Sequence, residues 1–333
     1  MLRRSLLLTP FIAQSAAAPV DDAIRYAEEH NSTGLVVIHK GRIVTENYWK
    51  GWTRDSSGPI YSASKSITST LIGMAIEDGK IRGVDQSMAD FVPTWKGTPK
   101  QAITIRHALS MTSGIKVGGD AAAAGVDQFT QTAALPMEHE PGSHWAYNTP
   151  VYRMLLRVLE KATGEPLAAY TKRKLTGPLG MDHGGWDGLP AGDETSYTWF
   201  RCTVRDMARF GELVLGRGEF QGKRLVSAKW LAEAQKSSQQ LNPAYGYLWW
   251  LNGQKAFQTP AGRLQQGMLW PDSPRDAVGA LGALDKKIYV VPSLGLVVAR
   301  HGGAAGVQRV LGPNQGFDNQ LLSKVCRGIS NPA

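Results

Sequence analysis

The chain of 333 residues has few cysteines, no long apolar run and none of several common functional motifs. Its two cysteines, Cys202 and Cys326, exclude a disulfide-rich scaffold; they either form one bond in an oxidising compartment or stay free. No apolar stretch approaches the roughly 20 residues of a membrane-spanning helix. The histidines lack metal-ligand spacing, so we expect no metal and no cofactor. Gly-x-Ser-x-Gly is also absent, which argues against an α/β-hydrolase fold.

What is present is ordinary globular composition with a basic balance. Hydrophobic residues make up 42% and charged residues 20%, and the formal net charge is +9. The basic residues are scattered, the longest run being Lys172-Arg173-Lys174, and no nucleic-acid-binding motif occurs. We therefore expect no nucleic-acid partner. The oligomeric state does not follow from the sequence.

The first 18 residues are predicted to be a weak signal peptide. Arg3-Arg4 form a basic start, residues 6–13 an apolar middle and Ala16–Ala18 a small-residue exit. This predicts a periplasmic or secreted protein. The alternative is the N-terminal tail of a cytoplasmic protein.

Hydrophobic periodicity places strands at both ends of the chain and helices in the middle. Strands are predicted over 34–39, 42–48, 245–251, 277–281, 287–291 and 294–300. Helices are predicted over 20–31, 62–78, 104–112, 150–163, 167–175, 204–216, 227–236 and 317–327. Short turns between strands make neighbours antiparallel. We predict an α/β (α+β) fold, in which residues 20–83 and 238–330 form an antiparallel sheet flanked by terminal helices, and residues 84–237 form an inserted all-helical subdomain.

Ser62-Ala63-Ser64-Lys65 is the strongest candidate for chemistry. A serine and a lysine three residues apart at the start of a helix share one face. A neutral lysine amine can take the serine proton, which makes a nucleophile. The alternative is that Ser62 caps the helix and Lys65 is solvated. A second copy, Ser113-Gly114-Ile115-Lys116, is interrupted by glycine and is predicted to end a helix.

Two further segments carry candidate groups. Tyr147 precedes a predicted helix and could exchange a proton with an ammonium group, although a tyrosine with an ordinary structural hydrogen bond is the alternative. His301-Gly302-Gly303 ends an apolar strand, where backbone N–H groups can hold an oxyanion; a simple glycine turn is the alternative. Aromatic residues could wall a pocket, although plain core is the alternative: Trp145, Trp199, Tyr245, Tyr247 and Trp249, the last three on one face of a predicted strand.

With these motifs in this order, the chain resembles the serine β-lactamase and penicillin-binding-protein superfamily. It is most similar to the class C-like branch, which holds family VIII carboxylesterases, D-aminopeptidases, D-Ala-D-Ala carboxypeptidases and 6-aminohexanoate-dimer hydrolases. The resemblance covers about residues 34–325. Besides Ser-x-x-Lys, it is carried by residues 103–114, 177–181, 203–211 and 288–292. It implies a β-lactamase/transpeptidase-like fold.

The resemblance also implies roles for the candidate residues. Ser62 would be the acylated nucleophile, Lys65 its proton acceptor, and Tyr147 the tyrosine of the family's Tyr-x-Asn motif. His301-Gly302-Gly303 would take the place of the Lys-Thr-Gly strand motif, with Trp199 among the substrate-binding residues. The backbone N–H groups of Ser62 and Ala304 would form the oxyanion hole.

The chain departs from the family pattern at two positions. Tyr147 is followed directly by Asn148 and Thr149, so either could take the asparagine's contact with Lys65. His301 replaces the lysine that lies near the β-lactam carboxylate in the family. We therefore predict a serine hydrolase that forms an acyl-enzyme and hydrolyses small esters or amides, and we expect its partner to be a small-molecule ester, amide or peptide substrate. A D-Ala-D-Ala carboxypeptidase, a weak β-lactamase and a non-catalytic ligand-binding member of the fold are the alternatives.

Overall fold

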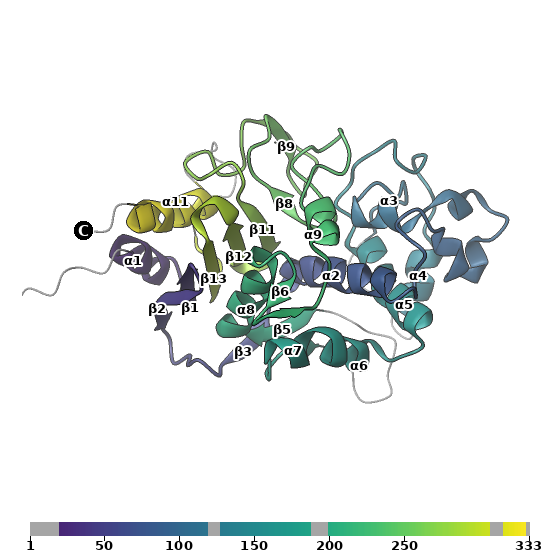
Figure 1. Ribbon diagram of the computed structural model, residues 1–333. Coiled ribbons are helices and arrows are strands. Elements are labelled where there is room, and N and C mark those ends of the chain that lie inside the picture. Colours follow the sequence, from purple (N-terminus) through teal and green to yellow (C-terminus); the bar gives the residue numbers. More distant parts are fainter. Residues whose placement is uncertain (1–19, 119–126, 188–198, 307–315, 331–333) are drawn as a thin grey trace, which may run out of the picture.

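The computed structural model describes residues 20–118, 127–187, 199–306 and 316–330 (Figure 1). The predicted signal peptide therefore lies outside the described residues. Among the described helices, none is both long and apolar enough to cross a membrane.

A six-stranded antiparallel sheet forms the core of the fold. Its order is β2-β1-β13-β12-β11-β8. The strands are β1 (Ser32–His39), β2 (Arg42–Tyr48), β8 (Trp250–Leu251), β11 (Val278–Gly282), β12 (Lys286–Val291) and β13 (Leu296–Gly302). Every residue of β12 and β13 is buried, which is what strands covered on both faces require. The central strands come from the two ends of the chain, as predicted.

Helices cover the sheet on both sides. The terminal helices α1 (Asp21–Glu29) and α11 (Phe317–Ser330) pack on each other, and α1 also packs on β1. On the other side, α8 (Val204–Leu215) packs on β12 and β13, and the long helix α2 (Ser64–Glu77) runs away from β11 (Figure 1). The predicted antiparallel sheet with flanking terminal helices is confirmed.

The segment from 84 to 237 holds most of the remaining helices. They are α3 (Ile105–Leu109), α4 (Gln128–Ala134), α5 (Thr149–Thr163), α6 (Leu167–Thr171), α7 (Gly177–Leu179) and α9 (Ala228–Ala234). The same segment also contributes short strands. β4 (Gly185–Trp186) and β5 (Phe200–Thr203) form a small sheet with β3 (Ser57–Pro59), and β6 (Glu219–Phe220) pairs with β7 (Lys223–Arg224). Because α8 packs on the main sheet, the exact bounds of two domains stay a prediction.

The predicted strand 245–251 is wrong over most of its length. Only Trp250 and Leu251 form β8, while a separate hairpin follows with β9 (Ala256–Gln258) and β10 (Leu264–Gln266). Leu248 adopts a φ of +62° and its N–H donates to the Leu109 carbonyl, so the chain turns before β8 begins. Tyr245, Tyr247 and Trp249 therefore do not share a strand face, and all three are buried in the core.

Candidate active site

Ser62 lies in the tight turn between β3 and α2. Tyr61, Ser62 and Ala63 form the 3₁₀ turn η1, and α2 continues directly from Ser64. Tyr61 has a φ of +47°, a strained conformation for an aromatic residue. Ser64 holds this turn, because its hydroxyl donates to the Tyr61 carbonyl and accepts the Phe200 N–H at 2.9 Å. In this turn Ser62 is half-buried.

Lys65 lies one turn along and donates to Ser62. Its Nζ is 3.2 Å from the Ser62 Oγ and 3.3 Å from the Thr149 Oγ1, and the residue is only 1% exposed. The spacing within Ser-x-x-Lys thus produces the serine–lysine contact that nucleophile activation needs. The second copy behaves differently: the Ser113 hydroxyl accepts the Ile115 N–H, and Lys116 pairs with Glu138 at 3.7 Å.

Three aromatic rings surround the Lys65 amine. Its Nζ lies 4.4 Å from the ring centroid of Tyr152, 4.8 Å from that of Tyr147 and 5.3 Å from that of Trp199. An ammonium group over an aromatic face gains about 0.5–2 kcal/mol, so these rings help to hold the Lys65 amine beside Ser62. Tyr152 was not singled out from the sequence; its helical spacing of three residues from Thr149 is the signal that points to it.

The start of α5 decides which residue contacts Lys65. Asn148 is the N-cap: its Oδ1 accepts the Val151 N–H at 3.2 Å, and its Nδ2 donates to the Ile115 carbonyl at 2.9 Å. With its amide occupied and only 2% exposed, Asn148 holds the helix start in place. Thr149, the first residue of α5, makes the contact with Lys65.

Tyr147 is held in an aromatic cluster. Its ring stacks on Trp250 with centroids 6.1 Å apart and meets Tyr245 edge-on at 6.1 Å, and Trp145 lies at 6.3 Å. Tyr245 and Trp145 are almost fully buried, whereas Tyr147 is half-buried. The cluster fixes the ring plane, so the Tyr147 side chain is presented beside Lys65 in one orientation.

The segment His301-Gly302-Gly303 packs against the start of β1. The His301 imidazole stacks on Trp52 at 4.4 Å, and its Nδ1 lies 3.3 Å from the Thr33 Oγ1. Burial and the nearby charge of Lys286 lower the pKa of His301 to about 3, so the ring is neutral at physiological pH. Ala304 is exposed, and its carbonyl accepts a hydrogen bond from Asn31.

The strand that borders the nucleophile turn is β11. A Cβ added to Gly282 would lie 2.1 Å from the Ile60 carbonyl oxygen, so only glycine permits this approach. On the β8 side of β11, the Ala277 carbonyl accepts the Asn252 N–H. Because every second residue of a strand directs its N–H to the same side, the N–H groups of Leu281 and Ala283 are expected to face that edge as well. In the sequence, the predicted strand 277–281 and the glycine that follows it, Gly282, are the features that could have pointed to β11 as the strand beside the nucleophile turn.

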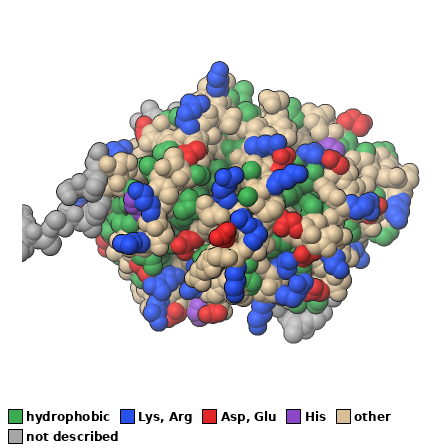
Figure 2. Space-filling model, viewed as in Figure 1, with side chains coloured by type: hydrophobic (Ala, Val, Ile, Leu, Met, Phe, Trp, Pro, Cys, Tyr) green, Lys and Arg blue, Asp and Glu red, His purple; other side chains and the backbone are tan. Residues whose placement is uncertain are grey.

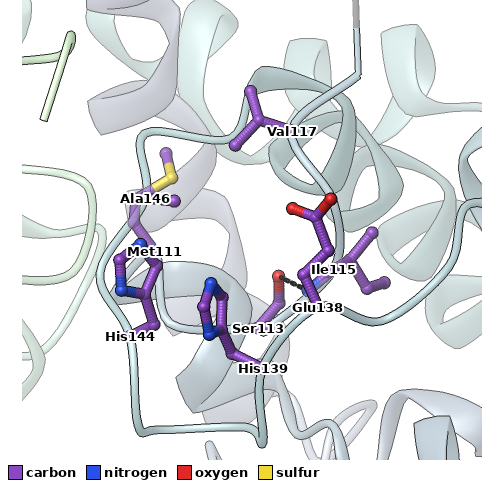
Figure 3. A pocket seen from close by; sticks show the side chains of 9 residues that line it. Met111, Ser113, Ile115, Val117, Glu138, His139, His144 and Ala146 are labelled. Carbon is purple, nitrogen blue, oxygen red and sulfur yellow. Dashed lines mark hydrogen bonds between the residues drawn. The ribbon is translucent and has the colours of Figure 1, made fainter.

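A small cavity lies between the segment that follows α3 and the segment that precedes α5 (Figure 3). It is lined by Met111, Ser113, Gly114, Ile115, Val117, Glu138, His139, His144 and Ala146. The imidazoles of His139 and His144 stack at 4.1 Å on its rim. Across the described parts of the chain, no three His, Cys, Asp or Glu residues gather as a metal site would require. The cavity lining includes neither Ser62 nor Lys65.

Charges of both signs share the surface in view (Figure 2), and the two cysteines are free thiols. On the face shown in Figure 2, Lys and Arg side chains are interspersed with Asp and Glu. Cys202 and Cys326 are both free and buried, and burial raises the pKa of each thiol. Neither cysteine forms a disulfide.

Comparison with known proteins gives consistent matches. The 6-aminohexanoate-dimer hydrolase of Paenarthrobacter ureafaciens is 23% identical over 309 residues, covering 79% of this chain and 75% of that protein. Esterase EstB of Burkholderia gladioli is 28% identical over 199 residues, covering 51% of this chain; the chain spans about half the length of that relative, at 50%. Both names describe hydrolytic enzymes.

Solved structures and a family model agree on the fold. A putative β-lactamase from Bacteroides dorei DSM 17855 superposes with a TM-score of 0.74 at 17% identity, covering 94% of this chain and 98% of that one. At this identity the likeness shows the fold alone. The model of the family described as Beta-lactamase matches residues 20–302, which include both β3 and β13. The chain therefore belongs to the Beta-lactamase family and is a hydrolase related to these enzymes.

Proposed function

We propose that this chain is a serine hydrolase that forms an acyl-enzyme on Ser62 and hydrolyses small carboxylic esters or amides. The observation that carries the proposal is the Lys65 Nζ at 3.2 Å from the Ser62 Oγ, held there by burial and by Thr149. A structural lysine on a helix surface would be solvated instead.

Acylation begins with proton transfer from Ser62 to a neutral Lys65. The Ser62 oxygen attacks the substrate carbonyl carbon, and the carbonyl π electrons move onto its oxygen. Two backbone N–H groups hold this oxyanion: that of Ser62, and that of Ala283 or Leu281 at the β11 edge. We place the second donor there rather than at Ala304, because β11 is the strand that approaches the turn. Each such donor is worth about 10²–10³ in rate.

Collapse of the tetrahedral intermediate expels the alcohol or amine. Tyr147, beside the protonated Lys65, delivers the proton that the leaving group needs and recovers one from Lys65. Water then attacks the acyl carbon with the same groups in reverse, releasing the carboxylic acid and regenerating Ser62. A positioned base contributes on the order of 10²–10⁴ in rate.

The groups around Ser62 favour esters over β-lactams. His301 is neutral and packs on Trp52, away from the β11 edge. The residues of β11 beside the turn, Ala280 and Leu281, are apolar. Neither position supplies the cation that pairs with a β-lactam carboxylate in the family. We expect slow cephalosporin turnover and faster cleavage of short esters.

A serine-directed probe tests this proposal. A fluorophosphonate should label the purified protein at Ser62, and Ser62→Ala should abolish both labelling and hydrolysis of p-nitrophenyl acetate and butyrate. Ser113→Ala, in the second Ser-x-x-Lys copy, is the matched control and should change neither. Hydrolysis that survives in Ser62→Ala at the original rate would refute the proposal. Ligand binding without labelling would favour the non-catalytic alternative.

A further inference from the structure

Lys286 is a buried lysine directly behind the nucleophile turn. It is the first residue of β12 and is 4% exposed. Its Nζ donates a hydrogen bond to the Gly302 carbonyl, which lies at the end of β13. The same Nζ lies 5.1 Å from the centroid of the Tyr61 ring. A single amine therefore joins the end of β13 to the residue immediately before Ser62.

The Tyr61 ring connects this amine to the active-site wall. It meets Trp199 edge-on, with centroids 6.0 Å apart, and Trp199 in turn borders the Lys65 amine. The backbone of Tyr61 is the strained element of the turn, with its φ of +47°. Strained residues persist only where their surroundings hold them. A cation over the ring face is one such hold.

The charged neighbours of Lys286 differ from those of the next residue. The charges of Arg300 and Asp285 affect the pKa of Lys286. Lys286 in turn helps to lower the pKa of His301, which is neutral and so places no charge beside Lys286. Burial first, and then the charge of Arg300, lower the pKa of Lys286 to about 8. Lys287 is equally buried, yet it pairs with Asp318 at 2.9 Å and with Asp285 at 3.4 Å.

We propose that the ammonium form of Lys286 is a positioning group for the reaction: it holds Tyr61, and through it Ser62, in the reactive conformation. This inference rests on the proposed function of Ser62. Lys286 touches neither the substrate carbonyl nor the leaving group in that mechanism. When Lys286 loses its proton, the attraction to the Tyr61 face is lost and the turn relaxes. Activity should then fall on the alkaline side although the fold persists.

A pH profile with three variants tests this. The wild-type kcat for p-nitrophenyl butyrate, corrected for spontaneous hydrolysis, should fall about threefold to tenfold as the pH rises from about 7.5 to 9.5. Lys286→Met should have a low kcat already at neutral pH and lack the fall. Lys286→Arg should keep its own neutral-pH kcat up to about pH 9.5, because a guanidinium stays charged. Lys287→Arg is the matched control and should keep the wild-type profile.

The outcomes separate this role from others. A fall that persists unchanged in Lys286→Met would assign the alkaline limb to another group, such as Tyr147, and would overturn the proposal. So would a wild-type kcat in Lys286→Met. Circular dichroism of each variant at both pH values shows whether the fold is retained, and Lys286→Gln is the replacement if the methionine variant does not fold.

A second readout does not depend on turnover. In Ser62→Ala protein carrying ¹³C-labelled tyrosine, the ring signals of Tyr61, assigned with Tyr61→Phe, should shift with a midpoint near pH 8. Lys286→Gln should abolish this shift. If the wild-type protein neither hydrolyses esters nor reacts with the probe, the proposed function fails. An absent Tyr61 shift overturns the role of Lys286 by itself.

Discussion

Replacing Lys286 by methionine should change how the stability of the protein depends on pH. Burial and the charge of Arg300 lower the pKa of Lys286 from 10.5 to about 8 in the folded protein. The unfolded chain keeps this proton up to the ordinary lysine pKa. Between about pH 8 and pH 10 the unfolded state therefore binds more protons than the folded state, and stability rises with pH. The contribution is fully present above the unfolded pKa and is lost as the pH falls through about 8.

The size of this effect follows from the two pKa values. One pKa unit corresponds to about 1.4 kcal/mol, so the complete shift is worth about 3 kcal/mol. From about pH 7 to pH 10, Lys286 should add about 2–3 kcal/mol to the free energy of unfolding. Methionine has no proton to lose, so Lys286→Met should lack this gain. Tyrosines with a raised pKa, such as Tyr26 at about 12, act in the opposite direction above about pH 10, but they are common to both proteins and cancel in the difference.

Urea unfolding followed by circular dichroism measures the difference directly. Urea titrations of both proteins are carried out at about pH 7, 8, 9 and 10. At each pH the free energy of unfolding of Lys286→Met is subtracted from that of the wild type, and the difference is plotted against pH. We expect this difference in the free energy of unfolding to rise with pH, while wild-type kcat falls over the same range. A difference that stays constant to within about 0.5 kcal/mol would refute a depressed pKa at Lys286.

Three further predictions concern Thr149, Gly282 and His301. Thr149→Val removes a hydroxyl partner of Lys65 and should lower kcat/KM about tenfold or more in steady-state ester hydrolysis; an unchanged value would deny Thr149 a part in catalysis. Gly282→Ala forces a Cβ to within 2.1 Å of the Ile60 carbonyl, so it should cost about 1–3 kcal/mol in urea unfolding and reduce kcat. Gly185→Ala, whose new Cβ meets no atom within 4 Å among the described residues other than its chain neighbours, should leave both unchanged. In proton NMR, the His301 ring should show no titration between about pH 5 and 8, and a midpoint near 6.5 would contradict its buried neutral state.

Local sequence patterns were sufficient for most strands of the main sheet and for the serine–lysine pair. Alternating and continuous apolar runs predicted β1, β11, β12 and β13 because these strands are buried. The three-residue spacing of Ser62 and Lys65 predicted a contact that depends on one helical turn alone. Both predictions concern interactions that short stretches of chain determine.

Long-range contacts could not be read from the sequence in the same way. Whether Asn148 or Thr149 contacts Lys65 depends on which residue caps α5, and that choice is fixed by the distant carbonyl of Ile115. Which glycine-bearing strand approaches Ser62 depends on sheet order, and β11 rather than the end of β13 occupies that place. The strand predicted from Tyr245 failed because a left-handed residue, Leu248, interrupts an alternating pattern.

The proposed function requires Ser62 to carry the acyl group during turnover. The most direct measurement is intact-protein mass spectrometry of rapidly quenched reactions with p-nitrophenyl acetate, followed by peptide mapping. We expect one added acetyl group per chain, located on Ser62, which forms and decays at rates consistent with kcat. An acetyl group on another residue, or steady ester hydrolysis in Ser62→Ala at the wild-type rate, would contradict it.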